Sequence, residues 1–211
     1  MTIDHGRLGM SVGEALFTQR SIRRFRPDPI APADLRLIFE AAVRAPNGGN
    51  RQIGRFLVVT DRARIAEFGT LYHEAWWAKR RDEHGWTGPH DIPPDATNYR
   101  AAAELADHMR DVPCVVLALA EPPGWANSIL PACQNLMLAA RALGIGSIPT
   151  TLHPTVMTRV YALFGIPSEL AFHFCIPLGY PAEGARFGGS RRRPIRETVF
   201  LDRWSAPAPW S

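Results

Sequence analysis

Cysteine is scarce in this sequence, with three residues in a chain of 211. Cys114, Cys133 and Cys175 lie far apart in apolar surroundings, and none forms a Cys-x-x-Cys pair or has a histidine at metal-ligand spacing. The pattern excludes a disulfide-rich secreted scaffold and predicts no metal site. We therefore expect three core thiols in a protein of a reducing compartment.

Long hydrophobic runs are absent as well. No apolar run approaches the roughly 18 residues that a membrane span needs. The start of the chain also lacks the basic and then apolar pattern of a signal peptide. These absences exclude a membrane partner and predict a cytoplasmic protein.

Charge is moderate and unevenly placed. Hydrophobic residues make up 46% of the chain and charged residues 21%, which is the composition of a globular protein, and we expect a single domain over residues 1–211. The net charge is +4, and the basic residues gather in two arginine clusters near the ends of the chain. Because these clusters form no continuous stripe, they favour a local phosphate site and argue against a nucleic-acid partner.

The first cluster is the stretch T-Q-R-S-I-R-R-F-R at residues 18–26. It holds four arginines in seven positions, with a serine hydroxyl and two apolar side chains between them. Such a segment can bury its apolar side chains and still present guanidinium groups, which bind phosphate through paired hydrogen bonds. We interpret it as a site for a phosphorylated cofactor; the alternative is a solvated basic surface. The second cluster, at residues 191–193, would be repelled by the first unless both bound one anion.

Hydrophobic periodicity predicts the regular elements. Helices are expected at residues 11–19, where Ser11 is a suitable N-cap, and at residues 33–45. Short apolar runs predict buried strands at residues 56–60, 115–120 and 172–178. Residues 129–143 have few strongly polar members, which predicts a buried core helix or an interface helix.

A long segment at about residues 62–110 separates the first two strands. It begins as a helix and has a middle rich in Gly, Pro and Asp at residues 85–99. Because a long insertion in a compact domain usually has a function, we expect either a lid over a pocket or a contact with a partner chain. Trp76, Trp77 and Trp86 in this segment are candidates to stack on an aromatic ligand.

Five short motifs follow one another along the chain. They are R-S-I-R-R-F at 20–25, A-P-N-G-G-N-R-Q at 45–52, P-A-C-Q-N-L-M-L-A-A-R-A-L-G at 131–144, P-L-G-Y-P-A-E at 177–183 and R-R-P-I-R-E-T-V at 192–199. In this order and spacing the sequence resembles the FMN-dependent nitroreductase family. The resemblance runs from about residue 14 to residue 204, apart from the insertion.

The resemblance implies an α+β fold, with a mainly antiparallel central sheet flanked by helices. It also implies an intertwined homodimer in which a C-terminal arm, at about residues 188–211, embraces the other subunit. Each of two sites at the dimer interface would hold one FMN. The expected partners are therefore a second copy of the chain and a small-molecule oxidised acceptor.

The arginine clusters match the family's phosphate-binding positions. By this resemblance, Arg20 and Ser21 would hold the phosphate, and Arg23 would reach the pyrimidine edge of the flavin ring. Arg191 and Arg193 match the late basic residues that close on the phosphate from the C-terminal side.

Two further segments match cofactor-binding positions of the family. Asn50 and Gln52 match the polar loop beside the ribityl chain and the ring. Thr151 and Leu152 match the backbone segment near flavin N5. The sequence departs from the family at residues 53–54, which are Ile-Gly where many members have Pro-Trp.

The activity implied by the resemblance is that of an FMN-dependent NAD(P)H oxidoreductase. It would reduce nitroaromatic, quinone or related acceptors by ping-pong hydride transfer through flavin N5, with NADH or NADPH as the donor. The cofactor carries this chemistry, so no catalytic side chain is expected, and Arg23 would tune the flavin. The alternatives are flavin-destroying synthesis of the cobalamin lower ligand, reductive dehalogenation, or a flavin-binding protein with little turnover.

Overall fold

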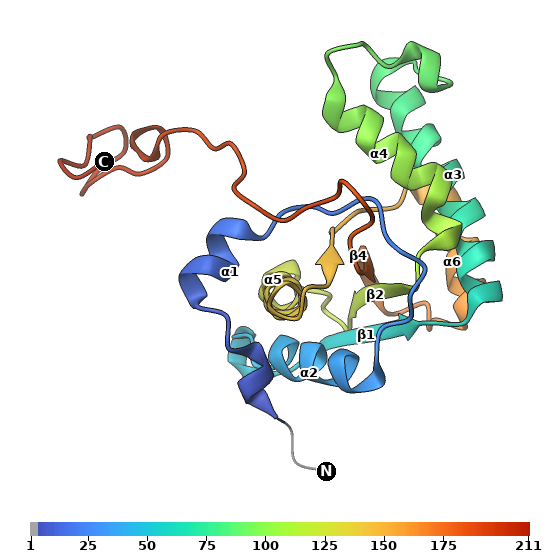
Figure 1. Ribbon diagram of the computed structural model, residues 1–211, viewed down its shortest axis with the longest axis horizontal. Helices are drawn as coiled ribbons and strands as arrows, with labels where there is room; N and C mark the ends of the chain where they lie inside the picture. The colour runs from blue at the N-terminus through green and yellow to red at the C-terminus, as the bar shows by residue number, and fades with distance from the viewer. Residues whose placement is uncertain (1–3) are drawn as a thin grey trace.

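A four-stranded sheet forms the centre of the computed structural model, which describes residues 4–211 (Figure 1). The strands in spatial order are β1 (Gly54–Val59), β2 (Cys114–Ala120), β4 (Ala171–Gly179) and β3 (Gly146–Ser147). All neighbouring strands are antiparallel. The predicted α+β fold with a mainly antiparallel sheet is therefore confirmed, and its three longer strands lie within two residues of their predicted positions.

Helices cover both faces of this sheet. The α-helices of the described chain are α1 (Val12–Thr18), α2 (Pro32–Ala42), α3 (Arg62–His84), α4 (Thr97–His108), α5 (Ala126–Ala142) and α6 (Pro154–Phe164). Short 3-10 helices lie at His5–Leu8, Gly48–Asn50, Pro89–Asp91, Met109–Asp111 and Ile195–Glu197. The Ser11 side chain accepts a hydrogen bond from the Glu14 backbone N–H at 3.0 Å, which confirms the predicted cap of α1.

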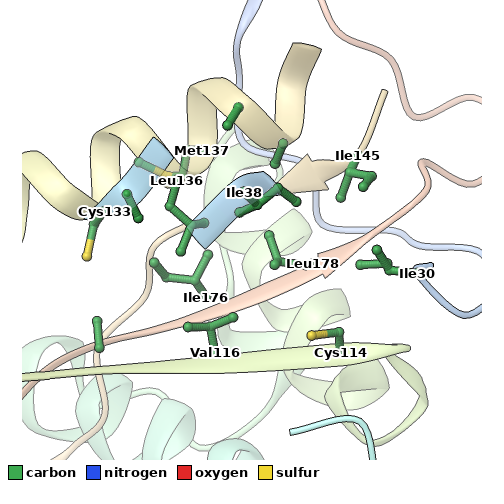
Figure 2. Packing of buried hydrophobic residues seen from close by; sticks show 14 of the residues in the cluster. Ile30, Ile38, Cys114, Val116, Cys133, Leu136, Met137, Ile145, Ile176 and Leu178 are labelled. Carbon is green, nitrogen blue, oxygen red and sulfur yellow. The ribbon is translucent and has the colours of Figure 1, made fainter. Parts of the chain in front are cut away.

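Strand β2 lies between two hydrophobic layers and is buried at every residue. Cys114 and Val116 face a core shared with α2 and α5, in which Ile176 and Leu178 of β4 lie between them and Ile38 (Figure 2). Val115 and Leu117 face a second core shared with α3 and α6. Because side chains of a strand alternate between its faces, this one apolar strand contributes side chains to both hydrophobic cores.

The insertion is a helical hairpin, in which α3 and α4 pack together and project beyond the sheet (Figure 1). Between the two long helices lie residues 85–96, with the short helix Pro89–Asp91. The irregular middle predicted at residues 85–99 is therefore wrong at residues 97–99, which begin α4. Helix α4 is amphipathic, with Ala103, Leu105 and Ala106 buried, and sequence analysis missed it beside the Gly-, Pro- and Asp-rich stretch before it.

All three cysteines are free and buried, as predicted. Burial raises the pKa of Cys114 and of Cys133 to about 12, so both thiols stay protonated at neutral pH. Within residues 4–211, no helix has the length and hydropathy that crossing a membrane requires. The same residues contain no group of three or more His, Cys, Asp or Glu side chains that could hold a metal ion.

The C-terminal residues form an arm that leaves the body of the protein (Figure 1). Its regular features are the turn Ile195–Glu197 and a bridge between Phe200 and Pro207. Trp204 and Trp210 are 85% and 65% exposed. The arm therefore presents aromatic surface that the rest of the described chain leaves uncovered.

Candidate functional site

The arginine stretch extends the sheet beyond β3. Ser21 forms a parallel bridge with Ser147, and the Ile22 N–H donates to the Ser147 carbonyl at 3.1 Å. Ile22 is buried and packs so closely on Gly146 that a Cβ there would lie 2.7 Å from the Ile22 Cβ. The apolar residue therefore anchors the segment, and the polar residues on either side of it remain available for binding.

Residues 182–188 run along the other side of the arginine stretch and hydrogen-bond to it. The Ala182 N–H donates to the Arg24 carbonyl at 3.1 Å, and the Gly188 N–H donates to the Thr18 carbonyl at 2.9 Å. Between the stretch, this segment and α4 lies a cavity of about 240 Å³. Its charged lining consists of four arginines and one carboxylate, namely Arg20, Arg23, Arg24, Arg186 and Glu104. An excess of cations around a small cavity is the arrangement that an anion requires.

Arg23 is the most constrained of these arginines. Its Nε atom is buried and has no hydrogen-bond partner within residues 4–211. Burial lowers the pKa of Arg23, Tyr72 acts in the opposite direction, and Arg20 lowers it further. A buried guanidinium donor without an acceptor costs free energy, so the geometry favours an acceptor group from a ligand.

The neighbouring arginines are directed outward. The Arg24 Nε lies 3.8 Å from a carboxylate oxygen of Glu104 on α4, and the Arg26 Nε lies 3.1 Å from Asp28. All four side chains are about half exposed, so these ion pairs stabilise the fold weakly. Arg23 therefore differs from Arg24 and Arg26 in facing the interior.

Helix α3 packs along the segment that contains Thr151 and Leu152. The Tyr72 hydroxyl lies 2.9 Å from the Thr150 Oγ1, and the Lys79 Nζ lies 3.4 Å from the Thr151 Oγ1. Thr150 is bridged to β4, and it follows the residue that pairs with Ser21 by only three positions. The structure therefore brings the predicted residues of the arginine stretch and of the threonine segment to the same edge of the sheet.

The predicted amide loop lies elsewhere. Asn50 and Gln52 are exposed and have left-handed backbone angles, with φ of 53° and 52°. The Gln52 N–H donates to the Asn47 Oδ1 at 2.8 Å, and the Gly48 N–H donates to the Ser128 Oγ at 3.1 Å. Gln52 lines a cavity of about 160 Å³ that shares no lining residue with the arginine cavity. Within one chain, Asn50 and Gln52 are therefore not brought to Arg20.

The second arginine cluster is also separate within the chain. Arg191 and Arg193 are exposed on the arm, and neither lines the arginine cavity. Arg186, which sequence analysis missed, does line it. Arg186 is a single arginine outside both clusters, so a search for runs of charge could not find it, and only the tertiary pairing of its segment reveals it.

The tryptophans of the insertion pack within the helical hairpin. Trp76 and Trp77 meet edge to face at 4.6 Å, and Trp86 meets Tyr99 of α4 at 5.2 Å. The Arg80 guanidinium lies over the rings of Trp76 and Tyr99, at 5.4 and 5.1 Å from their centroids. These contacts tie α3 to α4. Stacking of the tryptophans on an aromatic ligand stays a prediction.

A larger cavity, of about 600 Å³, lies between β1 and the segment that follows α6. Its lining is mainly apolar, including Phe56, Phe164 and Ile166, and at its rim Arg55 and Glu121 form an ion pair of 2.6 Å. It contains none of the predicted site residues. Its size alone therefore does not make it the functional site.

Comparisons with known proteins show which family and which solved structures the chain resembles. The model described as the nitroreductase family matches residues 16–180. A protein of Thermus thermophilus named NADH dehydrogenase is 33% identical over 200 residues, or 88% of this chain and 93% of that protein. An iodotyrosine deiodinase of Thermotoga neapolitana is 26% identical over 165 residues, or 77% of this chain and 84% of that protein. The solved structure of a nitroreductase with bound FMN from Bacteroides fragilis has a TM-score of 0.69 and 25% identity, covering 92% of this chain and all of that one.

Proposed function

Because the chain belongs to the nitroreductase family, we propose that it is an FMN-dependent oxidoreductase that uses NADH or NADPH to reduce an organic acceptor. The acceptors proposed are nitroaromatic compounds, quinones and related small molecules. The relative named NADH dehydrogenase supports a nicotinamide donor, and the FMN-bound nitroreductase supports the cofactor.

The arginine cavity carries this proposal, because its donors fit an FMN phosphate. Arg20 and Arg186 both line the cavity, and Ser21 adds a hydroxyl. The buried Arg23 Nε is a charged donor that still requires an acceptor. A phosphorylated cofactor satisfies these groups together, whereas a neutral ligand would leave several cations uncompensated.

Each part of the site has a proposed role. Arg20, Ser21 and Arg186 bind the phosphate, and the semi-buried Arg23 provides a fixed positive charge for the ring. Thr151 and Leu152 shape the wall beside α3. When bound, FMN supplies the hydride chemistry between donor and acceptor. The protein supplies binding, orientation and electrostatics, and no catalytic side chain is assigned.

We further propose that a second copy of the chain completes the site. Asn50 and Gln52 are exposed on a loop that does not reach the arginine cavity of its own chain. Arg191 and Arg193 lie on an arm that extends away from the body (Figure 1). In a homodimer arranged as the family resemblance implies, the partner chain would supply its amide loop and its arm to the cofactor bound in the arginine cavity.

Reductive deiodination is a second candidate activity, because one relative is named an iodotyrosine deiodinase. The two activities use different acceptors on the same cofactor. Steady-state oxidation of NADH and NADPH with menadione or nitrofurazone, measured beside 3-iodotyrosine, distinguishes them. Turnover of iodotyrosine alone would assign the chain to the second class.

A binding experiment tests the cofactor site. We expect the protein to bind FMN at least about tenfold more tightly than riboflavin in a fluorescence titration, since riboflavin lacks the phosphate. Arg186→Gln should weaken FMN binding by about tenfold and leave riboflavin binding unchanged. Arg36→Gln, on the exposed surface of α2, is the matched control and should change neither. Equal affinity for FMN and riboflavin in the unmodified protein would refute the phosphate site.

A further inference from the structure

One face of α3 is joined to the threonine segment by three polar contacts. Tyr72 meets Thr150, Lys79 meets Thr151 at 3.4 Å, and the Asp82 carboxylate lies 3.0 Å from the His153 Nε2. Positions 72, 79 and 82 are seven and three residues apart, which is the spacing of one helix face. Lys79 is therefore held toward Thr151 by the contacts on both sides of it.

The acidic residues near Lys79 have other partners. Glu83 lies 3.9 Å from the Lys79 Nζ but only 2.9 Å from an Arg80 nitrogen. Asp82 is paired with His153 at 3.0 Å. Within residues 4–211, the closest hydrogen-bond partner of the Lys79 ammonium is thus the neutral hydroxyl of Thr151. The ion pair of Lys79 with Glu83 is long, at 3.9 Å, and Glu83 is shared with Arg80.

We infer that Lys79 and Thr151 bind a carboxylate on the acceptor, so that the enzyme prefers aromatic acceptors that carry an acidic group. An ammonium and a hydroxyl side by side offer two donors to the two oxygens of one carboxylate. The Lys79 side chain is 41% exposed, so a ligand can reach it from solvent. The inference rests on the proposed function, because it is the family resemblance that matches Thr151 to the segment near flavin N5.

The assignment of Lys79 depends on its contact with Thr151. The tryptophans of the insertion were the acceptor contacts predicted from the sequence, and Lys79 was not among the predicted site residues. A lysine on an exposed helix is ordinarily a solvated charge. The contact with Thr151 distinguishes Lys79 from the adjacent Arg81. Arg81 has a side chain that is 60% exposed, and its Nε lies 3.6 Å from an Asp82 carboxylate oxygen.

Paired acceptors test the inference in turnover. The FMN-loaded protein is assayed with 4-nitrobenzoate and with 4-nitrobenzamide, which share a ring and a nitro group but differ in charge. We expect Lys79→Gln to raise the KM for 4-nitrobenzoate about tenfold and to leave the KM for the amide within twofold. Lys79→Arg should restore most of the preference. Arg81→Gln is the matched control and should change neither value.

A binding measurement separates this inference from the proposed function. Benzoate and benzamide are titrated against the FMN-loaded protein, and binding is followed by the flavin absorption spectrum. Tighter binding of benzoate than of benzamide, lost in Lys79→Gln, supports the carboxylate site even if neither nitro compound is reduced. The absence of saturable benzoate binding, an equal effect of Lys79→Gln on both ligands, or the same effect in Arg81→Gln would overturn it.

Discussion

At the residue scale, the difference between Arg23 and Arg24 is open to a direct test. Arg23 has a buried Nε without a partner, whereas Arg24 is half exposed beside Glu104. A fixed cation stabilises the negative charge that a flavin ring gains on reduction. Arg23→Ala should therefore lower the reduction potential of bound FMN by about 30 mV, equivalent to about 1.4 kcal/mol for two electrons. Arg24→Ala should leave it unchanged.

Spectroelectrochemical titration of the two variants, each fully loaded with FMN, measures this effect. Stopped-flow reduction by NADPH should also be slower in Arg23→Ala, since the same charge develops during hydride transfer. An unshifted potential in the loaded Arg23→Ala protein would mean that a different arginine faces the ring.

The part of the site that the sequence predicts well is local. Burial of Ile22 holds the stretch in place, and the residues beside it are free to bind, which the alternation of apolar and charged residues indicated. The position of Arg186 could not be predicted in the same way. It enters the cavity through hydrogen bonds that join residues 182 and 188 to residues 24 and 18, and such long-range pairing leaves no periodic signal.

At the scale of elements, Gly69 marks where the helical insertion meets the core. A Cβ on this residue of α3 would lie 2.5 Å from backbone atoms of Arg110, in the short helix that precedes β2. Backbone atoms cannot move aside as the end of a flexible side chain can. Gly69→Ala should therefore lower the free energy of unfolding by about 2 kcal/mol. This loss should exceed the gain of about 1 kcal/mol expected from helix propensity.

Gly13→Ala on α1 is the matched control, because no heavy atom lies within 4 Å of its added Cβ. This variant should be as stable as the original or more stable by about 0.5–1 kcal/mol. Urea denaturation of both variants, monitored by circular dichroism at equal FMN loading, gives the comparison. If Gly69→Ala were no less stable than Gly13→Ala, the close packing of α3 on Met109–Asp111 would be incorrect.

Among the helices and strands, β2 was predicted from the sequence and α4 was not. Both faces of β2 are buried, so all its residues are apolar. A short continuous apolar run in the sequence is typical of such a strand, which is why β2 was predicted correctly. Helix α4 buries small residues such as Ala103 and Ala106 against α3. Its sequence is nevertheless amphipathic, so the helix could have been predicted, and it was overlooked because the Gly-, Pro- and Asp-rich residues before it indicated irregular structure.

At the scale of the whole molecule, residues 4–211 leave large apolar side chains exposed in several places, of which α1 and the arm are two. Val12, Leu16 and Phe17 are exposed on α1, and Trp204 and Trp210 are exposed on the arm. Surface of this kind is typical of a protein interface. The family resemblance predicted a homodimer, and the family itself is confirmed; the dimer stays a prediction that these exposed residues support.

Mixed dimers test whether two chains build each cofactor site. One variant combines Arg20→Ala with Ser21→Ala, and the other combines Asn50→Ala with Gln52→Ala. If the arginine cavity of one chain works with the amide loop of its partner, each variant alone should bind FMN weakly. A dimer of one chain of each kind should then contain one intact site and one doubly damaged site, because the two damaged surfaces meet only once.

The measurement is the number of FMN molecules bound tightly per mixed dimer, after purification through two different affinity tags. We expect one tight site per dimer, confirmed by analytical ultracentrifugation of the loaded species. If each chain built its own site, every site of the mixed dimer would carry one damaged surface and no tight binding would return. Recovery of half the original capacity therefore requires that Asn50 and Gln52 act across the interface, which is the arrangement that their separation from Arg20 within one chain leads us to expect.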